Sequence, residues 1–310
     1  MGEKVYFETA AAARYRRIRC RISYPDKAPK GIIVIMHSAL EHSGLYKDFE
    51  KYFSEKGYAL VSHDAAGHGK SAVEKFELGF LSDSLGYHAI IEDAKKVVET
   101  AIAKIADKYE TNRKIPITIF GQGLGSSAAK LLAAESWCKG LVLIGDAGAG
   151  NFPMLKIWFT EQIAQIKGDR SRSDFFTKIA LGAAFKPREF KSYKEALTSD
   201  EKMLYAYNSD PLCGFNLTLS AAADYLSMRL AADRSYDNIN ENIPVFILSG
   251  EKDIFTRGAK AAEEIKEKFQ RAGNGNVTVK IYPEARHQLL REFCREEVYK
   301  DITEFLKTVK

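Results

Sequence analysis

The sequence lacks long apolar runs and has few cysteines. Its 310 residues contain nothing close to 18 consecutive apolar residues, and the first ten, MGEKVYFETA, include no apolar signal segment. We therefore expect neither a membrane-spanning helix nor a secretory signal. The four cysteines, Cys20, Cys138, Cys213 and Cys294, form no CxxC pair. Free thiols in a reducing cytoplasmic compartment are the expectation for such a chain.

The chain also lacks a strong excess of one charge. Its 46 basic and 41 acidic residues give a net charge of +5, and we predict no nucleic-acid partner. The densest basic segment, RYRRIRCR at 14–21, alternates with apolar residues. This alternation predicts the exposed face of a strand, and a patch for nucleic acid or lipid headgroups is the alternative.

Short apolar runs alternate with helical patterns through most of the chain. The helical patterns lie at 46–57, 90–105 and 126–136, and further helices follow the last two strands. This alternation predicts an α/β fold with a mainly parallel sheet covered on both faces. The expected strands are 31–37, 58–64, 115–120, 140–146, 243–250 and 277–283.

One segment breaks this alternation. Residues 147–240 show helical patterns and no convincing strand. We predict that 1–146 and 241–310 form the core and that 147–240 form an inserted helical cap (lid) over the carboxyl edge of the sheet, where open α/β sheets bind ligands. Its apolar residues either line a pocket or pack the cap onto the core; examples are Trp158, Phe159 and Phe185.

The segment IFGQGLGSSA at 119–128 combines a strand, closely spaced glycines and a helix. In the G-x-S-x-G pattern, a nucleophilic serine stands on a strained strand-to-helix turn, but here that position is Gly123. Glycine tolerates positive φ, so the turn survives while the attacking hydroxyl is lost. GQGLGS also begins like a dinucleotide-binding loop, although Ser126 occupies the place of the third glycine. The loop alone does not separate these two interpretations.

An acid and a histidine follow later strands in the order that a serine hydrolase requires. Asp253 comes after the strand at 243–250, and His287 after the strand at 277–283. We expect His287 to act as the base and Asp253 to orient it, with Asp146 as the fallback acid. The oxyanion hole would use the backbone N–H groups of Ala39 and Leu124.

Six segments, in order, resemble one family. They are HSALEHSGLYKDF, SHDAAGHGKS, GQGLGS, DPLCGF, LSGEKD and YPEARHQLL. Together they are similar to the motifs of the α/β-hydrolase family of bacterial lysophospholipases and monoacylglycerol lipases, which are serine aminopeptidase S33-type hydrolases. The resemblance implies an α/β-hydrolase fold and a Ser–Asp–His mechanism on acyl esters. By position, it assigns the nucleophile to Gly123, the acid to Asp253 and the base to His287.

The departures from the family pattern lie close together. The family has glycine, arginine, histidine and serine where this chain has Ser38, Ala66, Gln122 and Gly123. Gly123 reflects either an engineered knock-out or natural divergence. The chain is then an ester hydrolase, inactive as written. The alternatives are a non-catalytic protein that binds a small amphipathic ligand, and cofactor-free chemistry by His287 and Asp253 alone.

Other polar residues near these motifs are weaker candidates. Ser126 and Ser127 are expected to be structural, and Ser38 is a possible substitute nucleophile. In the family, residues such as His37, His42, His63 and His68 buttress loops, and His88 is expected at the surface. No HExxH spacing is present, so we predict no metal and no cofactor. The expected ligand is an acyl ester or a similar lipid-like small molecule.

Overall fold

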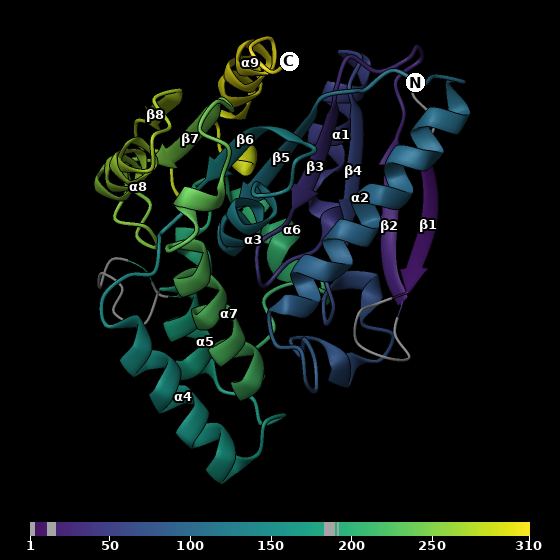
Figure 1. Ribbon diagram of the computed structural model, residues 1–310. Coiled ribbons are helices and arrows are strands. Elements are labelled where there is room, and N and C mark those ends of the chain that lie inside the picture. Colours follow the sequence, from purple (N-terminus) through teal and green to yellow (C-terminus); the bar gives the residue numbers. More distant parts are fainter. Residues whose placement is uncertain (1–3, 11–16, 183–189, 191) are drawn as a thin grey trace.

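A computed structural model describes residues 4–10, 17–182, 190 and 192–310. Within them, one eight-stranded sheet has the order β1-β2-β4-β3-β5-β6-β7-β8 (Figure 1). β2 runs antiparallel to both of its neighbours, β1 and β4. The other strands of the sheet, β3 to β8, are parallel to one another. The strands are β1 (Lys4–Ala10), β2 (Arg17–Ser23), β3 (Ile32–Met36), β4 (Ala59–His63), β5 (Ile117–Gln122), β6 (Cys138–Ile144), β7 (Val245–Gly250) and β8 (Val277–Tyr282).

Helices cover both faces of the sheet because its central strands are apolar on both sides. Ile32 and Val34 belong to the core under α2 (His88–Lys108), α3 (Leu124–Leu132) and α8 (Ala259–Arg271). Ile33 and Ile35 belong to the opposite core, under α1 (Lys47–Glu55) and α9 (Arg295–Leu306). The predicted α/β-hydrolase architecture is confirmed.

The described part of 147–240 consists of helices joined by turns and loops, and its only β-structure is one isolated bridge between Arg172 and Thr218. α7 packs on α3 of the core and on α4 and α5. In Figure 1, α4, α5 and α7 gather at the lower end of the molecule. The α-helices within 147–240 are α4 (Pro153–Lys167), α5 (Asp174–Leu181), α6 (Glu201–Ser209) and α7 (Leu219–Ala232).

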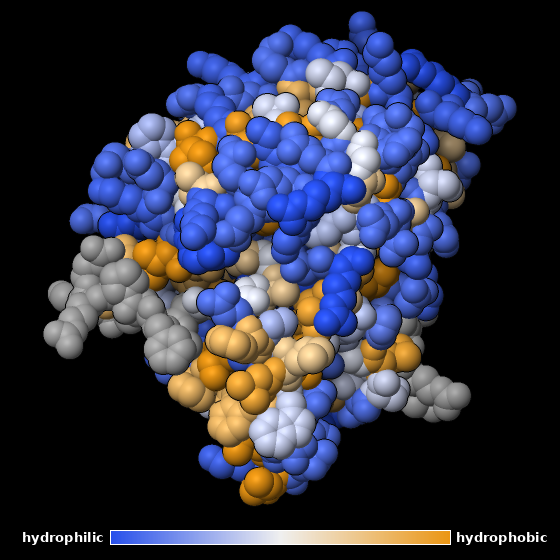
Figure 2. Space-filling view, turned by 60° about the vertical axis from the view of Figure 1, so that its left-hand side comes forward, coloured by the Kyte–Doolittle hydropathy of each residue, from blue (hydrophilic) through white to orange (hydrophobic). Residues whose placement is uncertain are grey.

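Large apolar side chains lie exposed on and beside α4 and α5. Figure 2 shows apolar surface gathered at the lower end of the molecule, where α4 lies in Figure 1. Trp158 and Phe159 are among these residues and line no part of the cavity described below, whereas Phe185 falls outside the described residues. None of the described helices has the length and apolar content needed to cross a membrane. The exposed residues are Phe152, Met154, Leu155, Trp158, Phe159, Ile166 and Phe175.

The basic segment at 14–21 is only partly the exposed face that its alternation predicts. In β2, Arg17 and Arg19 are exposed, but Arg21 is buried. Its Nε donates to Glu50 Oε2 at 2.8 Å, so an acid on α1 draws this third arginine inward. Residues 14–16 lie outside the described part of the chain.

Candidate active site

The corner between β5 and α3 has the sharp geometry that its glycines predict. Gly123 has φ 54° and ψ −122°, a conformation that favours glycine. A Cβ on Gly121 would lie 2.5 Å from Ser126 Cα, and one on Gly125 would lie 2.2 Å from Met36 O. The flanking glycines therefore allow α3 to approach β3 and β5 closely, and Gly123 accommodates the turn.

The loops after β7 and β8 bring an acid to an imidazole. His287 Nδ1 lies 2.8 Å from Asp253 Oδ2, and both side chains are buried. The Phe255 N–H donates to the other Asp253 oxygen at 2.9 Å. This pairing keeps the proton on Nδ1 and turns Nε2 away from the carboxylate. Burial opposes the charged imidazole, but the Asp253 carboxylate outweighs it and raises the pKa of His287.

Gly123 lies directly beside that free ring nitrogen. A Cβ built on Gly123 would be 2.9 Å from His287 Nε2. The same Cβ would be 2.5 Å from Ser38 Oγ, which enters from the loop after β3. A side chain at 123 would thus contact the imidazole, and Ser38 now fills part of that space.

Asp146, the fallback acid, has a different partner. Its Oδ2 lies 2.7 Å from Lys130 Nζ, and its Oδ1 accepts from the Gly148 N–H at 3.0 Å. Lys130 is fully buried; although burial opposes its charge, Asp146 raises the pKa of this lysine. The structure therefore pairs the imidazole with Asp253, and Asp146 neutralises a buried cation.

The two N–H groups expected to form an oxyanion hole lie in the turn after β3 and at the start of α3. Neither Ala39 N nor Leu124 N donates to another described residue. The first N–H groups of a helix carry partial positive charge, which suits a developing anion. Leu124 lines the cavity, whereas Ala39 is buried and does not line it, although its neighbours Ser38 and Leu40 do.

A cavity opens beside these groups. Its lining combines leucines and aromatic rings with polar side chains, among them His287, Ser38 and Gln288. Such a mainly apolar cavity with a few convergent polar groups is typical of small-molecule sites. Its lining comprises Ser38, Leu40, Glu41, Gly123, Leu124, Ser127, Gly145, Asp146, Ala147, Leu181, Tyr193, Leu197, Tyr207, Arg229, Phe255, His287 and Gln288.

Three polar residues fix the loops of this site: Glu41 and Gln288, which were not singled out from the sequence, and Gln122, which was noted there only as a departure from the family pattern. Glu41 accepts from the Ser38 N–H at 2.9 Å and from Gln288 Nε2 at 2.8 Å. Gln122 Nε2 donates to the His287 carbonyl at 3.1 Å. Their positions depend on contacts between distant loops, for which the sequence carries no spacing signal.

The serines after the corner differ in their surroundings. Ser126 Oγ donates towards the carbonyls of Gly121 and Ile144, at 2.9 and 3.1 Å. Its hydroxyl therefore ties α3 to the sheet. Ser127 is buried and lines the cavity.

Three of the neighbouring histidines hold loops together. His37 Nδ1 donates to Ser38 O at 2.7 Å, and its Nε2 accepts from the Ala65 N–H at 3.0 Å. His68 Nε2 contacts Ala39 O, and His42 Nε2 bonds to Asp210 at 3.0 Å. The ring nitrogens of His63 have no hydrogen-bond partner in the described chain, and His88 is exposed as predicted.

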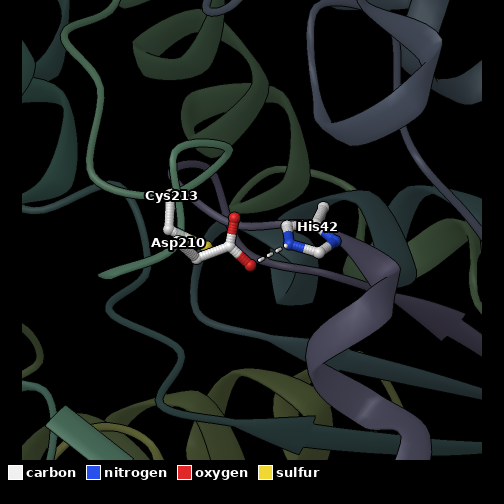
Figure 3. A group of neighbouring side chains, drawn as sticks. All are labelled: His42, Asp210 and Cys213. Atoms are coloured by element: carbon white, nitrogen blue, oxygen red, sulfur yellow. Dashed lines mark hydrogen bonds and ion pairs between the residues drawn. The ribbon is translucent and has the colours of Figure 1, made fainter. Parts of the chain in front are cut away.

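One cluster has the composition of a metal site. His42, Asp210 and Cys213 offer ligand atoms within 4.8 Å of one another (Figure 3). However, His42 Nδ1 accepts from the Gly44 N–H at 3.1 Å, so its proton lies on Nε2, which faces Asp210. Both ring nitrogens are therefore engaged, and burial raises the pKa of the Cys213 thiol. This arrangement fits a hydrogen-bonded clamp between two loops better than a set of free metal ligands.

Comparisons with known proteins agree with this architecture. The chain is 25% identical over 296 residues to a monoglyceride lipase homolog of monkeypox virus, covering 94% of this chain and 93% of that protein. It is 26% identical over 278 residues to human monoglyceride lipase, covering 88% and 80%. A thermostable carboxyl esterase from Bacillus coagulans superposes with a TM-score of 0.86 at 20% identity, over 100% and 99% of the two chains.

The model of one family, described as serine aminopeptidase S33, matches residues 27–293. This range includes all six motifs noted in the sequence. The chain belongs to this family of α/β-hydrolases, and monoglyceride lipases are among the proteins that it resembles over most of its length.

Proposed function

We propose that the cavity binds a carboxylic ester of an acyl chain and that the chain is built as a lysophospholipase-like or monoacylglycerol lipase-like hydrolase. The observation that carries this proposal is the alignment of Asp253, His287 and residue 123. The Nδ1–Oδ2 distance of 2.8 Å and the 2.9 Å approach of Nε2 to the Gly123 Cβ position support it. In the proposed site, His287 is the general base and Asp253 holds its tautomer.

The route through residue 123 is closed in the chain as written. Gly123 has no atom that can attack a carbonyl. If a serine stood there, its proton would pass to His287 Nε2 as its oxygen attacked the ester carbon. The N–H groups of Leu124 and Ala39 would stabilise the resulting oxyanion. The helical segment 147–240 would serve as the cap that encloses the acyl chain.

The relatives support the substrate class. The human and Mycolicibacterium smegmatis proteins similar to this chain are a monoglyceride lipase and a monoacylglycerol lipase. The apolar wall of the cavity suits an acyl chain, and the polar groups at His287 suit the ester.

Restoring a serine at 123 tests the proposal. Because a Cβ there would meet Ser38 Oγ at 2.5 Å, the sharper variant is S38G/G123S, which removes that obstacle. The matched control is S38G/G123A, which has the same space but no hydroxyl. The assay is the initial rate on p-nitrophenyl butyrate and on a medium-chain monoacylglycerol.

We expect S38G/G123S to exceed the alanine control by roughly 10³-fold or more, the scale on which a triad nucleophile acts. Melting curves check that both variants fold. If a folded S38G/G123S is no faster than S38G/G123A on either ester, the hydrolase proposal is wrong, and the cavity is better described as a binding site for a small amphipathic ligand.

A further inference from the structure

The Ser38 side chain reaches the place that the missing side chain of residue 123 would occupy. Its Oγ lies 2.5 Å, and His287 Nε2 lies 2.9 Å, from the same point, the Cβ position of Gly123. Ser38 is partly exposed and lines the cavity. A hydroxyl therefore faces both the imidazole and the space where a ligand would bind.

The backbone of Ser38 is fixed, whereas its hydroxyl is uncommitted. Its N–H donates to Glu41 Oε1 at 2.9 Å, and its carbonyl accepts from His37 Nδ1 at 2.7 Å. In the described chain, no partner is recorded for Ser38 Oγ, in contrast to Ser126 Oγ, which faces two carbonyls. A hydroxyl that makes no structural hydrogen bond, on a loop whose backbone is held in place, is available to a reacting substrate.

We propose that Ser38 is the nucleophile of the chain as written. This inference rests on the proposed ester-binding function and adds the residue that attacks. The Ser38 proton passes to His287 Nε2 while Oγ forms a bond to the ester carbonyl carbon. His287 then gives the proton to the departing alcohol as the ester C–O bond breaks. Water, activated by the same imidazole, hydrolyses the acyl–Ser38 ester and releases a carboxylic acid.

The short distance between Ser38 Oγ and the Cβ position of Gly123 also shows that the site has room for only one serine side chain, at 38 or at 123. A serine at 123 and the present Ser38 rotamer would collide at 2.5 Å. The motif comparison agrees, since the family pattern has glycine at position 38 and serine at position 123, and this chain has the reverse. The hydroxyl thus lies in the loop after β3 instead of at the corner after β5, close to the same point that His287 Nε2 approaches.

Covalent labelling of the unaltered chain tests this inference. The protein is treated with a fluorophosphonate probe, and the modified peptide is identified by mass spectrometry. We expect one adduct, on Ser38, and its loss in S38A and in H287Q. The matched control is S84A, which removes an exposed hydroxyl that does not line the cavity and should keep the adduct. Hydrolysis of p-nitrophenyl butyrate should fall to background in S38A but not in S84A.

An adduct on a residue other than Ser38, no adduct at all, or unchanged hydrolysis in a folded S38A would overturn the assignment. This failure is distinguishable from failure of the proposed function. If S38G/G123S hydrolyses esters while Ser38 takes no label, only the Ser38 assignment is wrong. If neither protein reacts, both are wrong.

Discussion

A buried histidine beside the site predicts that the protein loses stability in mild acid. His63 ends β4, is 1% exposed, and has no hydrogen-bond partner for either ring nitrogen in the described chain. Burial, and secondarily the nearby His37, lowers the pKa of His63 to about 3. The unfolded chain would take up a proton near the ordinary pKa of about 6.5, whereas the folded chain would not.

The direction and size of this change in stability follow from the number of protons that the folded and unfolded states bind. Below pH 6.5 the unfolded state binds more protons, so stability falls as the pH falls, down to the folded pKa of about 3. At pH 5 this single group destabilises the fold by about 2 kcal/mol relative to pH 7.5. Replacing the ring with an aliphatic side chain, in H63L, removes that loss.

Urea unfolding at pH 7.5 and pH 5 measures the effect. We expect the fall in unfolding free energy between the two pH values to be about 2 kcal/mol smaller in H63L than in the parent. The control is F53L, a change at a fully buried ring with no titratable group, which should lower stability equally at both values. If H63L keeps the full pH dependence of the parent, His63 is not held neutral by burial and the reasoning fails.

Three further changes follow from contacts at the site. In an S38G/G123S background, D253N should lower kcat by about 10⁴-fold. It should also move the acid limb of the pH profile of kcat/KM to lower pH, because the Asp253 carboxylate raises the pKa of His287. If the acid limb does not move in D253N, Asp253 does not raise the pKa of His287. K130M leaves the carboxylate of Asp146 buried without its cation and should cost about 3–5 kcal/mol in urea unfolding, a cost that K130M/D146N should largely remove. G121A should destabilise by about 1–3 kcal/mol or more because its Cβ meets backbone at 2.5 Å, whereas G275A, with open space around it, should change little.

The sequence predicted the parts of the site that local patterns determine. Apolar runs located the parallel strands, and ligands collect where such strands end. That rule and the chain order were enough to select Asp253 and His287, which the structure places 2.8 Å apart. The glycine spacing likewise predicted the tight corner at Gly123.

The features that the sequence did not predict depend on contacts between distant segments. β1 lies at the edge of the sheet, and none of its described side chains is buried, so it lacks the continuous apolar run that located the central strands. Arg21 follows the exposed pattern of its strand, yet Glu50 on α1 holds it inside. The orientation of Ser38 depends on how closely the loop after β3 approaches Gly123. No periodic pattern in the sequence indicates that distance.

The most direct test of the account is the site of covalent attachment in S38G/G123S after exposure to a fluorophosphonate. The account holds that His287, oriented by Asp253, activates whichever hydroxyl stands beside the corner of β5 and α3. It predicts a single adduct on the serine introduced at position 123 and none when H287Q is added. An unlabelled but folded S38G/G123S, or an adduct that persists with H287Q, would contradict it.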